Sequence, residues 1–330
     1  MPAVSVIIPT FNRAHLIQQT LDSVLNQSFR DFEVIVVDDG STDHTRDVVS
    51  QYPVKYVYQS NQGPPNARNM GIKTAEGRYL AILDSDDCML KQSLEKRVAM
   101  LDRFPEIAFV YGQVYLMDDS GNITGLAQPP FQQSGIRDGK TEIHDLLYAN
   151  HIAASSVMIR KSCLDKVGLF NPAFIHGQED LELWVRLCMV FNSGYLAEPL
   201  IKLRIHSRRI TEQTDLVWFE MNHHWIIESV FSHPVLKQLF KAEEAKIYSR
   251  LYTFMADSAY TRSARTAIRS YILKAFRMYP RDLFSPVGWK WGYWLLFSLT
   301  PNFLIRLARR FKRQIKALSS SPPVYNPPGE

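Results

Sequence analysis

Short apolar runs and amphipathic stretches alternate along the first 115 residues of the chain. The apolar runs, rich in Val and Ile, predict buried strands at residues 4–9, 32–37, 54–58 and 79–83. The stretches between them carry apolar side chains at helical spacing and predict helices at residues 14–27, 43–52 and 66–74. Strands that alternate with helices form a mostly parallel sheet with helices on both faces. The pattern therefore predicts an α/β fold.

The alternation becomes less regular in the rest of the chain. Strands are predicted at residues 109–117, 153–159 and 195–205, a helix at 179–191, and a loop at 125–140, which contains two prolines. Long helices are predicted at residues 218–231, 235–259 and 263–278. We therefore expect a domain at residues 1–210, with halves at 1–115 and 116–210, a helical C-terminal region at 211–318, and a disordered tail at 319–330.

The net charge of +5 is unevenly distributed. Residues 281–316 contain eight basic side chains and one acidic side chain, Asp282. Trp and Tyr near Lys and Arg are typical of a segment that lies in a membrane interface. We therefore predict that residues 281–316 bind an anionic membrane surface, with a basic helical face exposed to water as the alternative. Lys290, Pro301 and Asn302 interrupt the apolar stretch, so no spanning helix is predicted.

Cysteine usage and the start of the chain favour a cytoplasmic protein. The cysteines, Cys88, Cys163 and Cys188, are odd in number and lack metal-ligand spacing, which favours a reducing compartment. The first predicted strand begins within a few residues of Met1, without a signal peptide. We expect a peripheral protein at the inner face of the cell membrane. No base-reading module is recognisable, so no nucleic-acid partner is expected, and the oligomeric state is not predicted.

Three carboxylates follow the predicted strand at residues 79–83. Asp84, Asp86 and Asp87 lie within four residues, and like charges this close repel each other. A divalent cation would remove the repulsion, and a cation held by few carboxylates takes its remaining ligands from water or phosphates. The end of a strand is also where open α/β sheets bind ligands. The run therefore predicts a metal and phosphate site.

Polar turns follow the other predicted strands at the same edge. Asp38 and Asp39 end the second strand, where Ser41 or Asp43 could simply cap the next helix. Arg68 lies near a helix N-terminus, where a cation is unfavourable unless an anion is close. A phosphate would suit both the arginine and the helix terminus. An ordinary surface arginine is the alternative, and the convergence of these turns favours the phosphate.

Four segments together resemble the family 2 inverting glycosyltransferases with the GT-A fold. They are Val4–Arg13, Val36–Asp43, Ala67–Gly71 and Leu83–Asp87, and the resemblance covers about residues 4–120. It implies the nucleotide-diphospho-sugar transferase fold, with a mostly parallel central sheet flanked by helices, and a nucleotide-sugar donor, most simply a UDP-sugar. The residues implied in donor binding are Pro9, Thr10, Asn12, Arg13, Asp38, Asp39, Arg68, Asp84 and Ser85.

The resemblance also assigns roles within the site. Thr10 and Asp39 would contact the base and ribose, and Asp84 would lie nearer the ribose. Asp86 would hold Mn²⁺ or Mg²⁺ across the diphosphate, with Asp87 as the alternative ligand. His206 resembles a family histidine that approaches the diphosphate or the metal, and imidazole is a suitable third ligand. A surface or core histidine is the alternative at that position.

Glu179 and Asp180 begin the helix predicted at residues 179–191 and resemble the family's Glu-Asp pair beneath the acceptor. Inversion in one displacement requires a base that takes the proton of the acceptor hydroxyl. Asp180 is the expected base and Glu179 the second choice, although acids also favour a helix N-terminus through its dipole. Trp184 and Trp218 could stack on sugars, but core packing is the favoured interpretation for each.

The sequence thus predicts a metal-dependent glycosyltransferase that modifies a glycan or lipid-linked acceptor in cell-envelope polysaccharide or glycolipid synthesis. Two other classes remain open. One is another nucleotide-using enzyme, but the first turn lacks the Gly-rich loops of dinucleotide-binding proteins and nucleotidyltransferases. The other is a non-catalytic nucleotide- or glycan-binding protein at a membrane, and the intact Asp84, Asp86 and Asp180 argue against it.

Overall fold

The computed structural model describes residues 1–129, 131–205 and 215–300. The chain forms two compact units, one ending at Ile247 and the other beginning at Tyr248. The first unit contains the sheet and its covering helices, and the second is helical. The helical C-terminal region is confirmed, but the compact units divide later in the chain than the boundary expected at residue 210.

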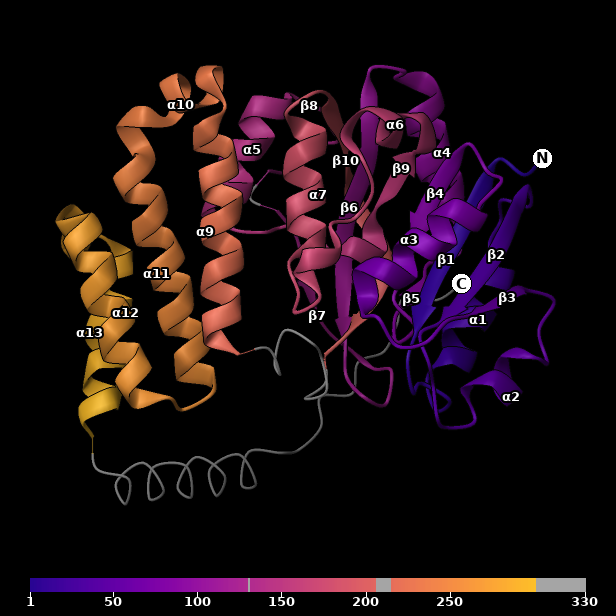
Figure 1. Ribbon diagram of the computed structural model, residues 1–330, viewed down its shortest axis with the longest axis horizontal. Helices are drawn as coiled ribbons and strands as arrows, with labels where there is room; N and C mark the ends of the chain where they lie inside the picture. Colours follow the sequence, from indigo (N-terminus) through magenta and orange to yellow (C-terminus); the bar gives the residue numbers. More distant parts are fainter. Residues whose placement is uncertain (130, 206–214, 301–330) are drawn as a thin grey trace, which may run out of the picture. The chain divides into compact units, whose positions relative to one another are not determined.

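A ten-stranded sheet forms the centre of the first unit (Figure 1). Its main path runs in the order β3-β2-β1-β4-β9-β6-β10-β5, with β7 beside β6 and β8 beside β10. The strands are β1 Val4–Thr10, β2 Phe32–Asp38, β3 Lys55–Tyr58, β4 Tyr79–Ile82, β5 Cys88–Met89, β6 Ile107–Met117, β7 Ile123–Ala127, β8 Gly135–Arg137, β9 Met158–Arg160 and β10 Asn192–Arg204.

The first four strands along the path are parallel, as expected for strands joined by helices. The short strand β9 lies antiparallel between β4 and β6, and β6 and β10 are parallel to each other. β5, β7 and β8 pair antiparallel with their neighbours. The sheet is therefore mixed, and the expectation of a mostly parallel sheet holds for its first half. The expected loop at residues 125–140 is wrong in part, because it contains part of β7 and all of β8.

Helices cover the sheet and make up the second unit. Three of them, α4, α5 and α6, were missed by the sequence prediction, and the helix expected at residues 235–259 is interrupted by a 3-10 turn at Lys241–Glu243. The helices are α1 Ile17–Leu25, α2 Thr45–Val49, α3 Pro64–Thr74, α4 Ser93–Arg103, α5 Gly139–Tyr148, α6 Leu164–Val167, α7 Glu179–Cys188, α9 Leu216–Ser232, α10 Pro234–Phe240, α11 Glu244–Thr261, α12 Arg265–Met278 and α13 Pro286–Leu299.

Alternation along β1 assigns its side chains to the two faces of the sheet. Val4, Val6 and Ile8 are fully buried in the core that also contains side chains of α1 and α4. Ile7 points to the opposite face, where α3 packs. Gly71 permits this close approach, because a Cβ there would come within 2.3 Å of Ile7 Cγ2.

The strand register brings three loops together at one edge of the sheet. Thr10 at the end of β1 lies opposite Asp38 at the end of β2. On the other side of β1, the Leu83 N–H donates to the Ile7 carbonyl at 3.0 Å, so the chain beyond β4 continues beside β1. The predicted convergence of the polar turns after β1, β2 and β4 follows directly from this register.

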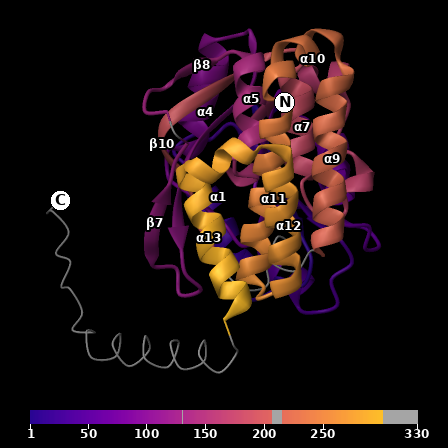
Figure 2. The same ribbon diagram turned by 90° about the vertical axis from the view of Figure 1, so that its left-hand side faces the viewer.

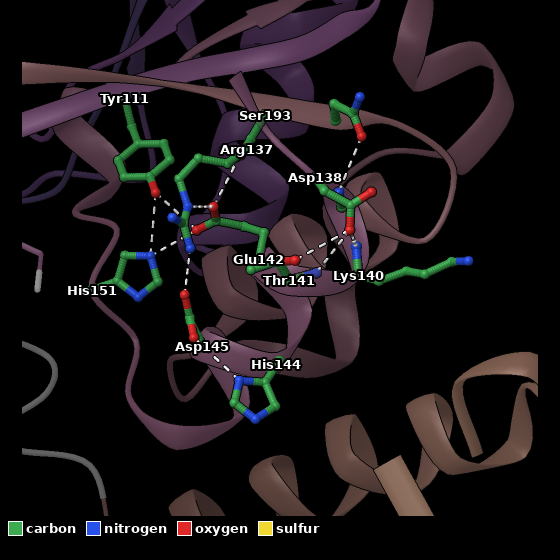
Figure 3. Close-up of polar contacts among 12 residues, drawn as sticks. Tyr111, Arg137, Asp138, Lys140, Thr141, Glu142, His144, Asp145, His151 and Ser193 are labelled. Atoms are coloured by element: carbon green, nitrogen blue, oxygen red, sulfur yellow. Dashed lines mark hydrogen bonds and ion pairs between the residues drawn. The ribbon is translucent and has the colours of Figure 1, made fainter. Parts of the chain in front are cut away.

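A buried polar network anchors α5 to the far half of the sheet (Figure 3). The Glu142 carboxylate accepts from Tyr111 at 2.8 Å, Arg137 at 2.6 Å and Ser193 at 3.1 Å, and it lies 2.7 Å from His151 Nε2. Burial alone would raise the pKa of Glu142, but the hydrogen bonds and charges of His151 and Arg137 lower it. Both carboxylate oxygens have protein partners, so the network is a structural anchor.

Helix α9 belongs to the first unit because it is attached to the turn before α7 (Figures 1 and 2). Asn222 Nδ2 donates to the Gly177 carbonyl at 2.9 Å, and Gln178 contacts His223. Phe219, Ile226 and Val230 of the same helix are buried. These contacts explain why the unit extends past residue 210.

Helices α12 and α13 pack together in the second unit (Figure 2). Trp291 and Trp294 of α13 are buried, and Trp291 Nε1 donates to Thr253 Oγ1 of α11 at 3.0 Å. Within the described ranges, no helix is long and apolar enough to cross a membrane.

Candidate active site

Arg68 lies at the centre of the polar edge of the sheet. It extends from α3 and is buried, with 5% of its surface exposed. Its guanidinium donates to Asp84 at 2.8 Å and also forms an ion pair with Glu179 at the start of α7. A buried guanidinium requires anionic partners. Protein carboxylates supply two of them, so the electrostatic conflict seen in the sequence is relieved within the chain itself.

The two aspartates after β2 hold the loops of this edge in place. Asp38 accepts from the Ser41 N–H at 2.8 Å and from the Tyr56 hydroxyl at 2.7 Å. Asp39 accepts from Gln59 at 2.7 Å and from the N–H groups of Gln62 and Gly63, both at 2.9 Å. A carboxylate offers about four acceptor positions, so Asp39 retains capacity for one more donor.

Asn12 connects the turns after β1 and β2. It adopts a left-handed conformation with φ of 52°, and its Oδ1 accepts from the Thr42 N–H at 2.8 Å. Its own N–H donates to Ser41 Oγ at 2.9 Å. Pro9 precedes this turn within β1. The Thr10 hydroxyl is buried, and among the described residues it has no hydrogen-bond partner. A bound ligand could supply one.

The carboxylates after β4 differ in their surroundings. Asp84 and Asp86 are partly exposed, and Asp86 lies 3.7 Å from Arg13. Asp87 is buried and accepts from Ser155 Oγ at 2.6 Å and from the Arg204 N–H at 2.9 Å. Its burial, with the charges of Asp86 and Asp84, raises the pKa of Asp87 well above its usual value. Asp87 is therefore built into the protein interior.

Hard oxygen ligands such as Asp84 and Asp86 suit Mg²⁺ or Mn²⁺. The described parts of the chain contain no cluster of three or more acidic, His or Cys side chains that could hold a metal. A cation at this place would therefore take further ligands from phosphate and water. His206, the third ligand expected from the sequence, lies outside the described residues.

Asp180 lies in the first turn of α7, beside Glu179. Its Oδ1 accepts from the Leu181 N–H at 2.7 Å. Burial, followed by the negative charge of Glu179, raises the pKa of Asp180 to about 7, although the charge of Arg68 opposes the shift. A carboxylate with a pKa near the working pH is well suited to act as a general base.

Several residues of this site were missed by the sequence prediction. Arg204 is buried, and its guanidinium donates to the backbone carbonyls of Asp86 at 3.0 Å and Asp118 at 2.9 Å. Ser155 donates to Asp87 and accepts from the Asp84 N–H at 3.1 Å. Ser85 is buried, and its carbonyl accepts from the Thr20 hydroxyl at 3.0 Å. The sequence could have indicated Arg204, because it lies two residues before the candidate ligand His206. Nothing in the sequence marked Ser155.

The two tryptophans considered for sugar stacking differ in position. Trp184 is fully buried and stacks on Phe109, with ring centroids 5.4 Å apart, so it is a core residue. Trp218 on α9 is 44% exposed and stacks on His176, with ring centroids 4.6 Å apart. Trp218 thus remains available to a ligand.

Residues 5–168 match the model of glycosyl transferase family 2. An uncharacterized glycosyltransferase from Rickettsia prowazekii (strain Madrid E) is 30% identical over 275 residues, which cover 82% of this chain and 83% of that protein. This chain belongs to glycosyl transferase family 2. A second relative of this glycosyltransferase is TuaG of Bacillus subtilis (strain 168), named for a provisional role in teichuronic acid biosynthesis. TuaG is 32% identical over 68% of this chain and 87% of its own length.

The fold of this glycosyltransferase also matches solved structures. Residues 1–349 of S. aureus TarS in complex with UDP-GlcNAc superpose with a TM-score of 0.63, at 19% identity, over 90% of this chain and 89% of TarS 1–349. TarS 1–349 in complex with UDP gives a TM-score of 0.55. The GT-A fold expected from the sequence is thereby confirmed. Family membership also favours a glycosyltransferase over the two other classes, another nucleotide-using enzyme and a non-catalytic binding protein.

Proposed function

We propose that this glycosyltransferase moves a sugar from a UDP-sugar to an acceptor hydroxyl with inversion at the anomeric carbon. The observation that carries the proposal is Asp180, a carboxyl with its pKa raised to about 7 by burial, one residue from Glu179. Through Arg68, Glu179 is linked to Asp84 and thus to the carboxylate run. The proposed base and the proposed diphosphate site therefore belong to one connected cluster of charged side chains.

In the proposed reaction, the Asp180 carboxylate takes the proton of the acceptor hydroxyl. The acceptor oxygen forms a bond to the anomeric carbon while the bond from that carbon to the diphosphate breaks. The nucleoside diphosphate leaves with the electron pair. Glu179 is the alternative base, but its ion pair with Arg68 keeps its carboxylate occupied, which favours Asp180.

The donor would bind across the carboxyl ends of β1, β2 and β4. The Thr10 hydroxyl and the remaining acceptor capacity of Asp39 are available to the base and ribose. Arg13 provides a cation for the diphosphate, while Pro9, Asn12, Asp38, Arg68 and Ser85 shape and hold the loops. Ligands of open α/β sheets bind at this edge. The complexes of TarS with UDP and with UDP-GlcNAc support a UDP-linked donor by analogy.

A divalent cation, Mn²⁺ or Mg²⁺, would bind at Asp84 and Asp86 and would stabilise the charge of the leaving diphosphate. The buried contacts of Asp87 favour Asp86 as the ligand of the pair. His206 remains a proposed third ligand. Arg204 holds the backbone at Asp86 and would thereby position this carboxylate.

The proposed acceptor is a glycan or lipid-linked sugar of the cell envelope, a class suggested by the name of TuaG. Calorimetry with UDP, UDP-sugars, GDP-sugars and dTDP-sugars, each with and without Mn²⁺, tests the donor. UDP compounds should bind only weakly after chelation, because a cation held by Asp84 and Asp86 would offset the repulsion between these carboxylates and the diphosphate. Preference for another base would contradict the UDP assignment, and full affinity with chelator present would contradict the metal.

We also propose that the second unit binds the anionic inner leaflet of the cell membrane. Phe284 and Trp289 are 90% and 81% exposed, and Tyr293, Leu296 and Leu299 extend the apolar face along α13. Tryptophan and tyrosine favour membrane interfaces. The sequence after α13 carries six basic residues between Arg306 and Lys316, which complement anionic lipids.

Sedimentation with vesicles tests this binding. The intact protein should pellet with phosphatidylcholine vesicles that contain phosphatidylglycerol and remain in solution with phosphatidylcholine alone. Trp289→Ala should weaken pelleting severalfold, whereas Trp225→Ala, an exposed tryptophan of the first unit, should not. Equal pelleting of both variants would contradict the role of α13.

A further inference from the structure

Helix α9 presents a partly aromatic face to solvent. Trp218, Met221 and Trp225 are 44%, 53% and 47% exposed, and Val217 adjoins them. Their spacing of three and four residues places Trp218, Met221 and Trp225 on one side of the helix. Large apolar side chains gathered on one exposed face mark a binding surface.

This face leads directly to the proposed base. The Trp218 ring stacks on His176, and the Trp225 ring meets Phe174 edge to face, with ring centroids 5.3 Å apart. Phe174 and His176 belong to the segment that enters α7, and Asp180 follows four residues after His176. The aromatic face therefore packs against the segment that leads into the helix of the proposed base.

Hydrogen bonds fix α9 relative to Asp180. Asn222 donates to the Gly177 carbonyl at 2.9 Å. Burial lowers the pKa of His223 to about 4, so its imidazole is neutral. The Gln178 amide contacts both ring nitrogens of His223, and Nδ1 also lies 3.1 Å from the Phe219 carbonyl. These contacts hold the two tryptophans in a set position relative to the base.

A buried acceptor group also lies in this turn. Gln178 is 8% exposed, and its Oε1 has no hydrogen-bond partner within the described part of the chain. A buried amide oxygen without a partner is costly. A sugar hydroxyl that reaches the turn would satisfy it. The turn that leads from His176 to Asp180 thus contains an unfilled hydrogen-bond acceptor.

We propose that the α9 face binds the acceptor as an extended glycan, with successive pyranose rings on Trp218 and Trp225. This inference rests on the proposed function and names the class of its acceptor. Seven helical residues span about 10 Å, so one monosaccharide cannot cover both rings. Helix α9 contains no lysine or arginine, and the exposed Glu228 follows Trp225 on the same side, so the face favours a neutral sugar chain over anionic lipid or nucleic acid.

Binding of neutral hexasaccharides to the full-length protein tests the inference. Maltohexaose, cellohexaose, xylohexaose and N-acetylchitohexaose are titrated while tryptophan fluorescence is followed. At least one should bind, and at least tenfold more tightly than its monosaccharide. Trp218→Ala and Trp225→Ala should each weaken that binding tenfold or more, whereas Trp218→Tyr should retain most of it. Trp289→Ala is the matched control and should bind as the unmodified protein does.

Parallel titration with UDP and Mn²⁺ separates the two proposals. If UDP binds and no hexasaccharide does, the glycan face is wrong and the proposed donor function stands. If UDP also fails to bind, the proposed function itself is contradicted. Sedimentation of Trp218→Ala and Trp225→Ala checks for self-association, because a change of oligomeric state would make this face a subunit interface. Unaltered hexasaccharide affinity in both variants would equally overturn the inference.

Discussion

Arg68 of α3 forms a buried ion pair with Glu179 of α7, which lies 111 residues further along the chain. The same guanidinium binds Asp84 beyond β4 at 2.8 Å. One arginine therefore connects the loop proposed to manage the leaving diphosphate with the helix that carries the proposed base, Asp180. A shift on either side would be transmitted through this pair.

Arg68→Gln should destabilise the first unit by about 3–5 kcal/mol, because it leaves Glu179 buried without its cation. Urea unfolding followed by circular dichroism measures the loss. Arg78→Gln is the matched control: its ion pair with Asp102 is exposed and should contribute less than about 1 kcal/mol. Similar unfolding midpoints for the two variants would show that the buried pair does not stabilise the fold.

Asp86→Asn and Asp87→Asn should fail in different ways. Asp86→Asn should raise the Mn²⁺ concentration needed for half-maximal transfer tenfold or more, with little change in stability, because it removes an exposed ligand. Asp87→Asn should instead lower stability by about 1–3 kcal/mol, because its amide presents a donor to the Ser155 hydroxyl or the Arg204 N–H. Metal titrations and thermal unfolding of both variants distinguish these effects, and the reverse pattern would make Asp87 the ligand.

Gly71→Ala should destabilise the protein by about 1–3 kcal/mol, because the new methyl group would overlap Ile7 Cγ2 in the packed layer between α3 and the sheet. Gly292→Ala is a suitable control, since nothing lies within 4 Å of a Cβ on that exposed position of α13. Alanine should be neutral or favourable there. A Gly71→Ala protein that unfolds at the same temperature as the unmodified protein would contradict the close packing of α3.

The sequence predicted the first half of the fold well. Clear apolar runs mark the strands there, and the polar residues of the site follow directly after them. The runs that became β1, β2 and β4 are mostly buried, whereas the edge strand β3 is partly exposed, and the polar ends of β1, β2 and β4 mark the site. The sequence was less informative beyond residue 115. Strand β8 there has only three residues, too few for a recognisable period, and the same holds for the two-residue β5 earlier in the chain.

The site residues were predictable where a motif names them and unpredictable where tertiary contacts decide. Glu179 and Arg68 were both identified, but nothing in the sequence indicated that they form an ion pair with each other. Asp87 was an equal candidate for the metal until its contacts with Ser155 and Arg204 placed it in the interior. The α9 face depends on the fold of the turn before α7, and a hydrogen bond joins the two segments, which lie about 40 residues apart in the chain.

Asp180→Asn should leave UDP affinity unchanged and reduce kcat by about 10²–10⁴-fold, the usual contribution of a general base. Stopped assays of transfer, together with calorimetry for UDP, measure the two effects. Glu179→Gln is the comparison and should mainly weaken stability, because it leaves Arg68 with one fewer anionic partner. Greater loss of kcat in Glu179→Gln than in Asp180→Asn would exchange the roles of the two acids.

The pH dependence of kcat/KM tests the central claim most directly. Burial raises the pKa of Asp180 to about 7, and the base acts only when ionised. Transfer should therefore fall about tenfold per pH unit below pH 7 and level off above it, and this limb should disappear in Asp180→Asn. A rate that stays constant from pH 5 to pH 8, as expected for a carboxyl of ordinary pKa near 3.9, would contradict Asp180 as the base.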